Sequence, residues 1–156
     1  MRKRVSIIAV ALVLAGAACG GGAGSGLAAS DFIKQLLNLN IARQYGRMYE
    51  TLIPAQRRIV SRAIFIACFK KMGESLTQFR GASISAVKVI HTSTGVVTVP
   101  GTRQRVKATT FTYRAPIQLD KHTRSVTGSA RLVPSNGSWL WGMDPDTVSS
   151  AQHGTC

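Results

Sequence analysis

The sequence predicts an α+β fold in which N-terminal helices pack on a curved antiparallel sheet. Three observations support this prediction. Apolar residues recur at helical spacing from Asp31 to Gly73, the pattern changes to β-rich runs after Glu74, and the hairpin signal Asn136-Gly137 joins the last two runs. Helices followed by successive hairpins are typical of a domain whose helices cover one face of an antiparallel sheet.

Helical patterns occupy the first part of the chain. Apolar residues recur at helical spacing in four stretches, approximately residues 31–39, 42–52, 54 onward and 61–73. Ser30 and Ser61 are good N-caps, because a serine hydroxyl accepts a hydrogen bond from a backbone N–H of the first turn. Pro54 suits the start of a helix, where its missing N–H costs nothing. Gly73 is a natural end point.

Strand patterns fill the second part, at residues 83–92, 95–99, 103–119, 125–134 and 138–143. Pro100-Gly101 marks a tight turn before the longest run, and residues 120–123 form a polar turn after it. Trp139 and Trp141 are two residues apart in the last run, so they share one face of that strand.

The longest strand contains a break in its alternation. Arg103, Arg105 and Lys107 share one face, and simple alternation places Phe111 and Tyr113 on that same basic face. A β-bulge between the two groups would move the aromatic side chains to the apolar side. It would also bend the strand, as a curved sheet requires.

A secretory leader precedes the domain. The basic start MRKR is followed by an apolar stretch from Val5 to Ala15. An apolar core of about 7–15 residues with these flanks is typical of a signal peptide, and it is shorter than the roughly 20 residues of a membrane span. We therefore expect residues 1–18 to be a signal peptide.

Residues 15–19, AGAAC, resemble the bacterial lipobox, in which small residues precede a lipid-modified cysteine. This resemblance implies a lipid (palmitate-bearing) membrane anchor on Cys19 at the outer face of the cell membrane. The Gly-rich segment within residues 19–29 would then be a flexible tether for a single domain over residues 30–156. Gly16 departs from lipoboxes that carry leucine there. The alternatives are ordinary cleavage, which gives a secreted soluble protein, and a retained signal anchor.

The cysteines support the anchored alternative. An exported protein with three cysteines has an unpaired thiol unless one is modified. Lipid on Cys19 leaves Cys68 and Cys156 as an even pair, for which we predict a disulfide in an oxidising compartment. The alternative is a buried apolar Cys68 beside a frayed terminus.

The segment YGRMYETLIPAQRRIVSRAIFIACF and the ending NGSWLWGMDP together resemble small exported bacterial proteins of the nuclear-transport-factor-2-like superfamily. The resemblance covers most of residues 30–145. It implies a cystatin-like cone, in which helices close a curved sheet around an apolar cavity. Candidate cavity-lining residues are the aromatic side chains Tyr45, Tyr49, Phe65, Phe111, Tyr113, Trp139 and Trp141. Because the superfamily includes enzymes, binding modules and lipoproteins, the fold alone does not choose the function.

No catalytic set stands out, and we expect no catalytic residues, no metal site and no cofactor. The six carboxylates lie at helix starts, turns or solvent-facing positions, whereas acid–base catalysis near neutral pH usually needs a carboxyl group of raised pKa. The two distant cysteines and three scattered histidines lack metal-ligand spacing. A carboxylate or histidine beside a tyrosine in an apolar cavity would favour an enzyme.

The chain is strongly basic, with 20 Lys and Arg against 6 Asp and Glu and a net charge of +14. This balance favours contact with anionic surfaces, although a merely solvated basic face explains it as well. Candidate contact residues for anionic lipid or an envelope polyanion are Arg57, Arg58, Arg62, Arg103, Arg105 and Lys107. Export and the scarcity of aromatic residues among the cations argue against nucleic acid as a partner.

The sequence therefore favours a membrane-tethered exported lipoprotein whose domain binds a ligand or interacts with the cell envelope. One alternative is a small enzyme of the isomerase or dehydratase type that uses the cone cavity. Another is a purely structural domain in which phenylalanine and tryptophan side chains fill that cavity. The oligomeric state and the ligand are not encoded in any recognisable pattern.

Overall fold

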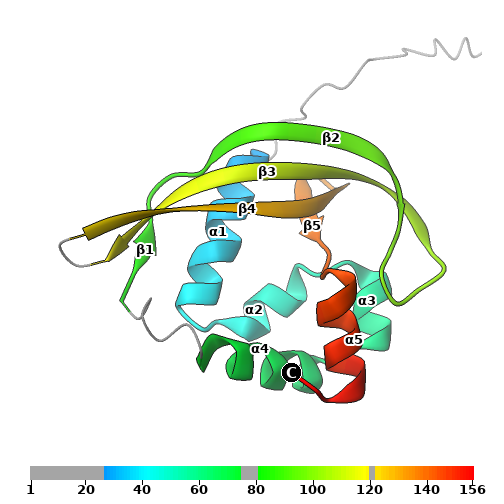
Figure 1. Cartoon of the computed structure of the whole chain (residues 1–156). Helices are drawn as coiled ribbons and strands as arrows, with labels where there is room; N and C mark the ends of the chain where they lie inside the picture. Colours follow the sequence, from blue (N-terminus) through cyan, green and yellow to red (C-terminus); the bar gives the residue numbers. More distant parts are fainter. Residues whose placement is uncertain (1–26, 75–80, 120–121) are drawn as a thin grey trace, which may run out of the picture.

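The computed structural model describes residues 27–74, 81–119 and 122–156 (Figure 1). The predicted signal peptide, Cys19 and most of the tether lie outside the described residues, as does part of the predicted turn at 120–123. None of the helices in the described residues has the length and hydrophobicity of a membrane span.

The predicted α+β class is confirmed. Within the described residues, four helices come first, five strands follow and one helix comes last. The helices are α1 (Ala29–Ile41), α2 (Tyr45–Glu50), α3 (Pro54–Ile59), α4 (Arg62–Glu74) and α5 (Pro145–His153). The strands are β1 (Ser83–Ile84), β2 (Lys88–Thr98), β3 (Arg105–Leu119), β4 (His122–Ser135) and β5 (Ser138–Trp141).

All strand pairs in the sheet are antiparallel, and β3 is its central strand. β4 pairs with one edge of β3, and β5 continues the sheet beyond β4. The other edge of β3 is shared by β2 and, at its far end, by the two-residue strand β1. The long strands bow over α1, and the remaining helices lie below that curved layer (Figure 1).

Two strand predictions were wrong. The runs 83–92 and 95–99 do not form two strands of those lengths, because β1 ends at Ile84 and β2 continues without interruption from Lys88 to Thr98. The predicted bulge is also not in the longest strand. β3 keeps an unbroken register with β2 from Arg105 to Thr112 and with β4 from Thr109 to Leu119, and the register shift lies on β2 between Val89 and His91.

The buried side chains of β3 switch from one face of the strand to the other along its length, because different helices cover the two faces. Near the start of the strand, Val106 packs with a small cluster centred on Ile53, Ala55 and Val99 at helix α3. Further along, Phe111 and the odd-numbered residues after it pack in the cluster formed with α1. A strand that buries one face and then the other needs no extra residue to reverse its burial pattern.

Local signals predicted most turns and helix ends. Asn136 and Gly137 both have positive φ values, 44° and 74°, as the hairpin signal requires. Pro54 begins α3, and the Ser61 hydroxyl accepts a hydrogen bond from the N–H of Ile64 at 3.3 Å. The prediction that Ser30 caps the first helix was wrong. Helix α1 begins at Ala29, and its N-cap residue is Ala28, which makes no side-chain capping hydrogen bond.

The C-terminal helix α5 was not predicted, although its signals are present. Asp144 caps it, proline follows directly, and Gly154 ends it with a left-handed φ of 67°. The predicted disulfide links Cys68 in α4 to Cys156, with a Cα–Cα distance of 5.0 Å. This bond holds the end of the chain against the helices, where Cys156 packs on the helical core.

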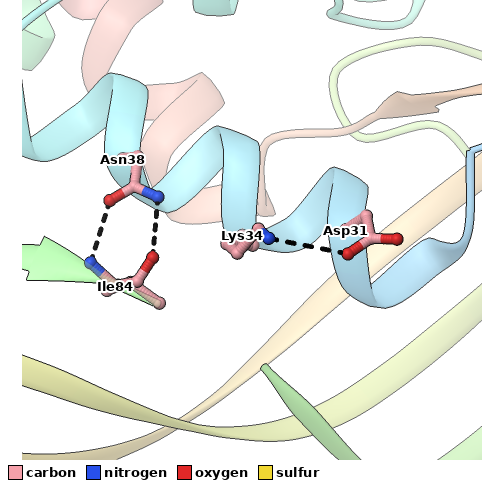
Figure 2. Close-up of polar contacts among 4 residues, drawn as sticks. All are labelled: Asp31, Lys34, Asn38 and Ile84. Atoms are coloured by element: carbon pink, nitrogen blue, oxygen red, sulfur yellow. Dashed lines mark hydrogen bonds and ion pairs between the residues drawn. The ribbon is translucent and has the colours of Figure 1, made fainter. Parts of the chain in front are cut away.

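Two side-chain amides fasten the layers together. In Figure 2, the Asn38 amide of α1 donates to the Ile84 carbonyl and accepts from the Ile84 N–H, both at 3.0 Å. Gln56 of α3 binds the Met143 peptide groups in the same way, at 3.0 and 2.8 Å, and is completely buried. On the exposed side of α1, Lys34 and Asp31 form an ion pair at 3.7 Å (Figure 2).

Candidate functional site

A pocket of about 380 Å³ lies between the helices and the edge of the sheet. Helix α1 contributes one wall through Ile33, Leu36, Leu37 and Asn40, and Met48 of α2 adjoins it. Phe69 and Met72 of α4 contribute the opposite side. Ligand pockets commonly have volumes of about 300–1,000 Å³ and mostly apolar walls with a few polar groups.

The pocket forms where β4 extends beyond its neighbour β5. Strand β5 pairs with residues 132–135 of β4, and the N–H of Gly142 reaches only one residue further, to the carbonyl oxygen of Arg131 at 3.3 Å. Ser129, Ala130 and Arg131 line the pocket directly beyond that point. Backbone groups of residues two apart in a strand point the same way, so Ser129 directs its N–H and C=O towards the pocket side.

Arg131 has an unusual environment. Its Nε is buried but makes no hydrogen bond with any described residue. Arg131 lines the pocket, as does Thr110, its register partner on β3. Buried polar atoms nearly always have a hydrogen-bond partner in native proteins, so an unpartnered guanidinium nitrogen calls for a specific explanation.

Asp144 is the other charged residue among the described residues that line the pocket. Its carboxylate caps α5, accepting from the Thr147 N–H at 2.9 Å and from the Thr147 hydroxyl at 2.7 Å. Burial alone would raise the pKa of Asp144, but the hydrogen bonds from Thr147 and neighbouring backbone groups outweigh it and lower the pKa. The carboxylate is therefore ionised at neutral pH and already has partners.

Tyr113 also lines the pocket, and burial raises the pKa of its hydroxyl. Its ring lies over Gly128, its register partner on β4. A Cβ at residue 128 would come within 2.6 Å of the Tyr113 hydroxyl oxygen, so glycine is needed for this close approach.

The seven aromatic candidates are divided among three places. Tyr113 and Trp141 line the pocket. Tyr45, Tyr49 and Phe65 instead pack into the helical core, where the Tyr49 and Phe65 ring centroids are 5.4 Å apart. Phe111 and Trp139 pack edge to face at 5.7 Å near the start of α1, and the Trp139 indole donates to the Leu27 carbonyl at 2.8 Å.

The six cationic candidates are also separated. Arg58 donates to the side-chain oxygen of Gln104 at 3.0 Å, which brings α3 beside Arg103 in the turn and Arg105 at the start of β3. Arg57 is the neighbouring exposed residue of α3, and Lys107 lies two positions further along β3. Arg62 belongs to α4 and faces Glu50 at 3.9 Å.

Most of the pocket residues were not among the sequence-predicted candidates. The methionines at positions 48, 72 and 143 all line the pocket, although they lie in three different parts of the sequence. A usable signal was Asn40, a polar residue that follows the apolar Ile33, Leu36 and Leu37 at helical spacing.

No group of three or more His, Cys, Asp or Glu residues suited to a metal ion exists in the described part of the chain. No protein-family model matches this chain, and no curated protein matches it significantly.

Proposed function

We propose that this protein is a non-catalytic binding domain that holds a small molecule in the pocket between α1, α4 and the edge of β4. The observation that carries the proposal is the pocket of about 380 Å³, with apolar walls from three helices and a few polar groups on the sheet side. This combination is typical of small-molecule sites. In a purely structural domain, side chains would be expected to fill this space.

Because Asp144 and Tyr113 both line the pocket, the alternative that the protein is an enzyme has to be compared with the binding proposal. A carboxylate beside a tyrosine in a cavity is the arrangement expected for an isomerase or dehydratase. Asp144, however, is an exposed residue, both its oxygens accept hydrogen bonds from Thr147, and its pKa is lowered. A general acid or base acting near neutral pH needs the opposite shift. These features favour binding over catalysis.

We further propose that the domain is exported and held at the outer face of the membrane through lipid on Cys19. The disulfide between Cys68 and Cys156 supports an oxidising compartment. The arrangement of helices beneath a bowed sheet is compatible with the nuclear-transport-factor-2-like cone (Figure 1). Cys19→Ala is expected to move the protein from the membrane to the soluble fraction. Unchanged fractionation would contradict the anchor.

The binding proposal is tested by filling the pocket. Leu37→Trp places a large side chain in the wall formed by α1, whereas Gln35→Trp adds the same side chain at an exposed position of that helix. We expect solvent extraction and mass spectrometry to recover a co-purified small molecule from the original protein and from Gln35→Trp, but not from Leu37→Trp. Equal recovery from all three proteins would place the ligand elsewhere.

A second candidate function is contact with an anionic lipid surface. The hydrogen bond between Arg58 and Gln104 favours it, because it brings the cations of α3 beside those of the β2–β3 turn. Cations near an anionic bilayer contribute about 1 kcal/mol each. Arg57→Gln with Arg58→Gln should therefore weaken binding to phosphatidylglycerol vesicles more than Lys70→Gln with Lys71→Gln on α4. Equal weakening would indicate only a general effect of net charge.

A further inference from the structure

We propose that the pocket selects an amphipathic anion, with an apolar body among the helices and a carboxylate, sulfonate or phosphate head at Arg131. This inference rests on the proposed binding function and adds the chemical class of the ligand.

The first argument is the unpartnered Nε of the Arg131 guanidinium. The Arg131 Nε is buried without a hydrogen bond to any described residue, and Arg131 is one of the residues that line the pocket. A guanidinium presents several N–H donors in one plane, and this geometry matches the oxygens of carboxylates and phosphates. An anionic group in the pocket would provide the acceptor that the protein itself does not supply.

The second argument is the balance of charge in the pocket. Among the described lining residues, Asp144 is the only possible counter-ion of Arg131, and the two form no ion pair within 4.0 Å. Both Asp144 oxygens accept hydrogen bonds from Thr147 at the start of α5. The negative charge of Asp144 is thus stabilised by the positive end of a helix, whereas the buried Arg131 Nε has no partner among the described residues.

The third argument concerns the walls beyond Arg131. Leu37 of α1 and the side chains of Phe69 and Met72 of α4 line the pocket with apolar surface. Met48 and Met143 complete this surface, and unbranched thioether side chains adapt readily to ligands of different shapes. Apolar contact favours a hydrocarbon or ring-containing body, and only the head of the ligand needs a charged partner.

The test uses dodecanoate as the anionic probe and dodecanol as its neutral counterpart. We expect the protein to bind dodecanoate at least about tenfold more tightly than dodecanol, because charge-assisted hydrogen bonds are roughly twice as strong as neutral ones. Arg131→Gln should remove this preference while leaving dodecanol binding unchanged. Arg131→Lys keeps the charge without the planar fork and should retain an intermediate preference.

Arg114→Gln is the matched control, since Arg114 is an exposed arginine of the same sheet that does not line the pocket. It should leave both affinities unchanged. Equal affinities for the two probes, unaffected by Arg131→Gln but lost in Leu37→Trp, would overturn the anion preference and leave the binding function intact. If no probe binds and Leu37→Trp changes no co-purified ligand, both proposals fail.

Discussion

The helical core and the pocket are neighbouring regions of the same molecule that use their side chains differently. In the helical core, the aromatic rings of Tyr49, Phe65 and Phe69 pack together, with centroid distances of 4.3 Å between Phe65 and Phe69 and 5.4 Å between Tyr49 and Phe65. The pocket is bordered by flexible methionines on one side and by small residues, Ser129, Ala130 and Gly142, on the other. Phe69, Trp141 and the three methionines belong to both regions.

This difference shows why aromatic content is a poor guide to a binding site. Large rings fill space efficiently, so most of the aromatic residues close the core. The pocket remains open because the sheet side offers small residues at the point where β5 ends. The location of the pocket therefore depends on the unequal lengths of β4 and β5 rather than on a motif.

The largest expected effect on stability distinguishes the helical core from the pocket. Phe65 is completely buried, so Phe65→Ala should lower the free energy of unfolding by about 3–5 kcal/mol. Leu37→Ala removes a half-buried wall of the pocket and should cost clearly less, since less close-packed surface is lost. Urea denaturation measures both values. Similar losses would show that the pocket wall is as tightly packed as the core.

The hydrogen bonds of the Gln56 and Asn38 side chains should have an intermediate effect on stability. They compare a completely buried contact with a partly exposed one. Gln56→Leu leaves the buried N–H and C=O of Met143 without partners, at a cost of about 1–3 kcal/mol for each group. Asn38→Leu frees peptide groups of Ile84 in a half-buried environment, where water can replace the amide. We therefore expect a smaller loss of unfolding free energy for Asn38→Leu. The opposite order would contradict the difference in burial.

The smallest expected effect is dependent on pH. Asp144→Ala removes the cap of α5 and should cost about 1 kcal/mol at pH 7. Because the pKa of Asp144 is lower in the folded protein, its contribution is complete above the unfolded pKa and is lost as pH falls through the folded pKa. The stability difference between the two proteins should therefore shrink below about pH 4. A difference that stays constant to pH 2 would show that the charge of the carboxylate is unimportant.

The sequence predicted the fold class because its signals were local. Pro54 and Ser61 at helix starts and Asn136-Gly137 at the hairpin act through neighbouring residues, and the structure contains them as expected. The disulfide was predicted from the number of cysteines and the expected compartment.

The pocket could not be predicted because it is a non-local feature. Asn38 binds a peptide 46 residues away, and Gln56 binds one 87 residues away. The change of burial in β3 depends on which helices cover its two faces, and not on the strand's own pattern. Arg131 gives no local signal in the sequence, and its importance follows only from the absence of a partner for its Nε among the described residues.

The central claim is that an amphipathic anion occupies the pocket, and the methionine methyl groups test it most directly. The chain has four methionines, of which Met48, Met72 and Met143 line the pocket and Met1 lies in the predicted leader. With ¹³C-methyl-methionine labelling, a titration with dodecanoate should shift all three pocket resonances with a single saturation curve. In Arg131→Gln, the same shifts should require at least about tenfold more dodecanoate. Pocket resonances that stay unchanged at saturating dodecanoate would contradict the claim.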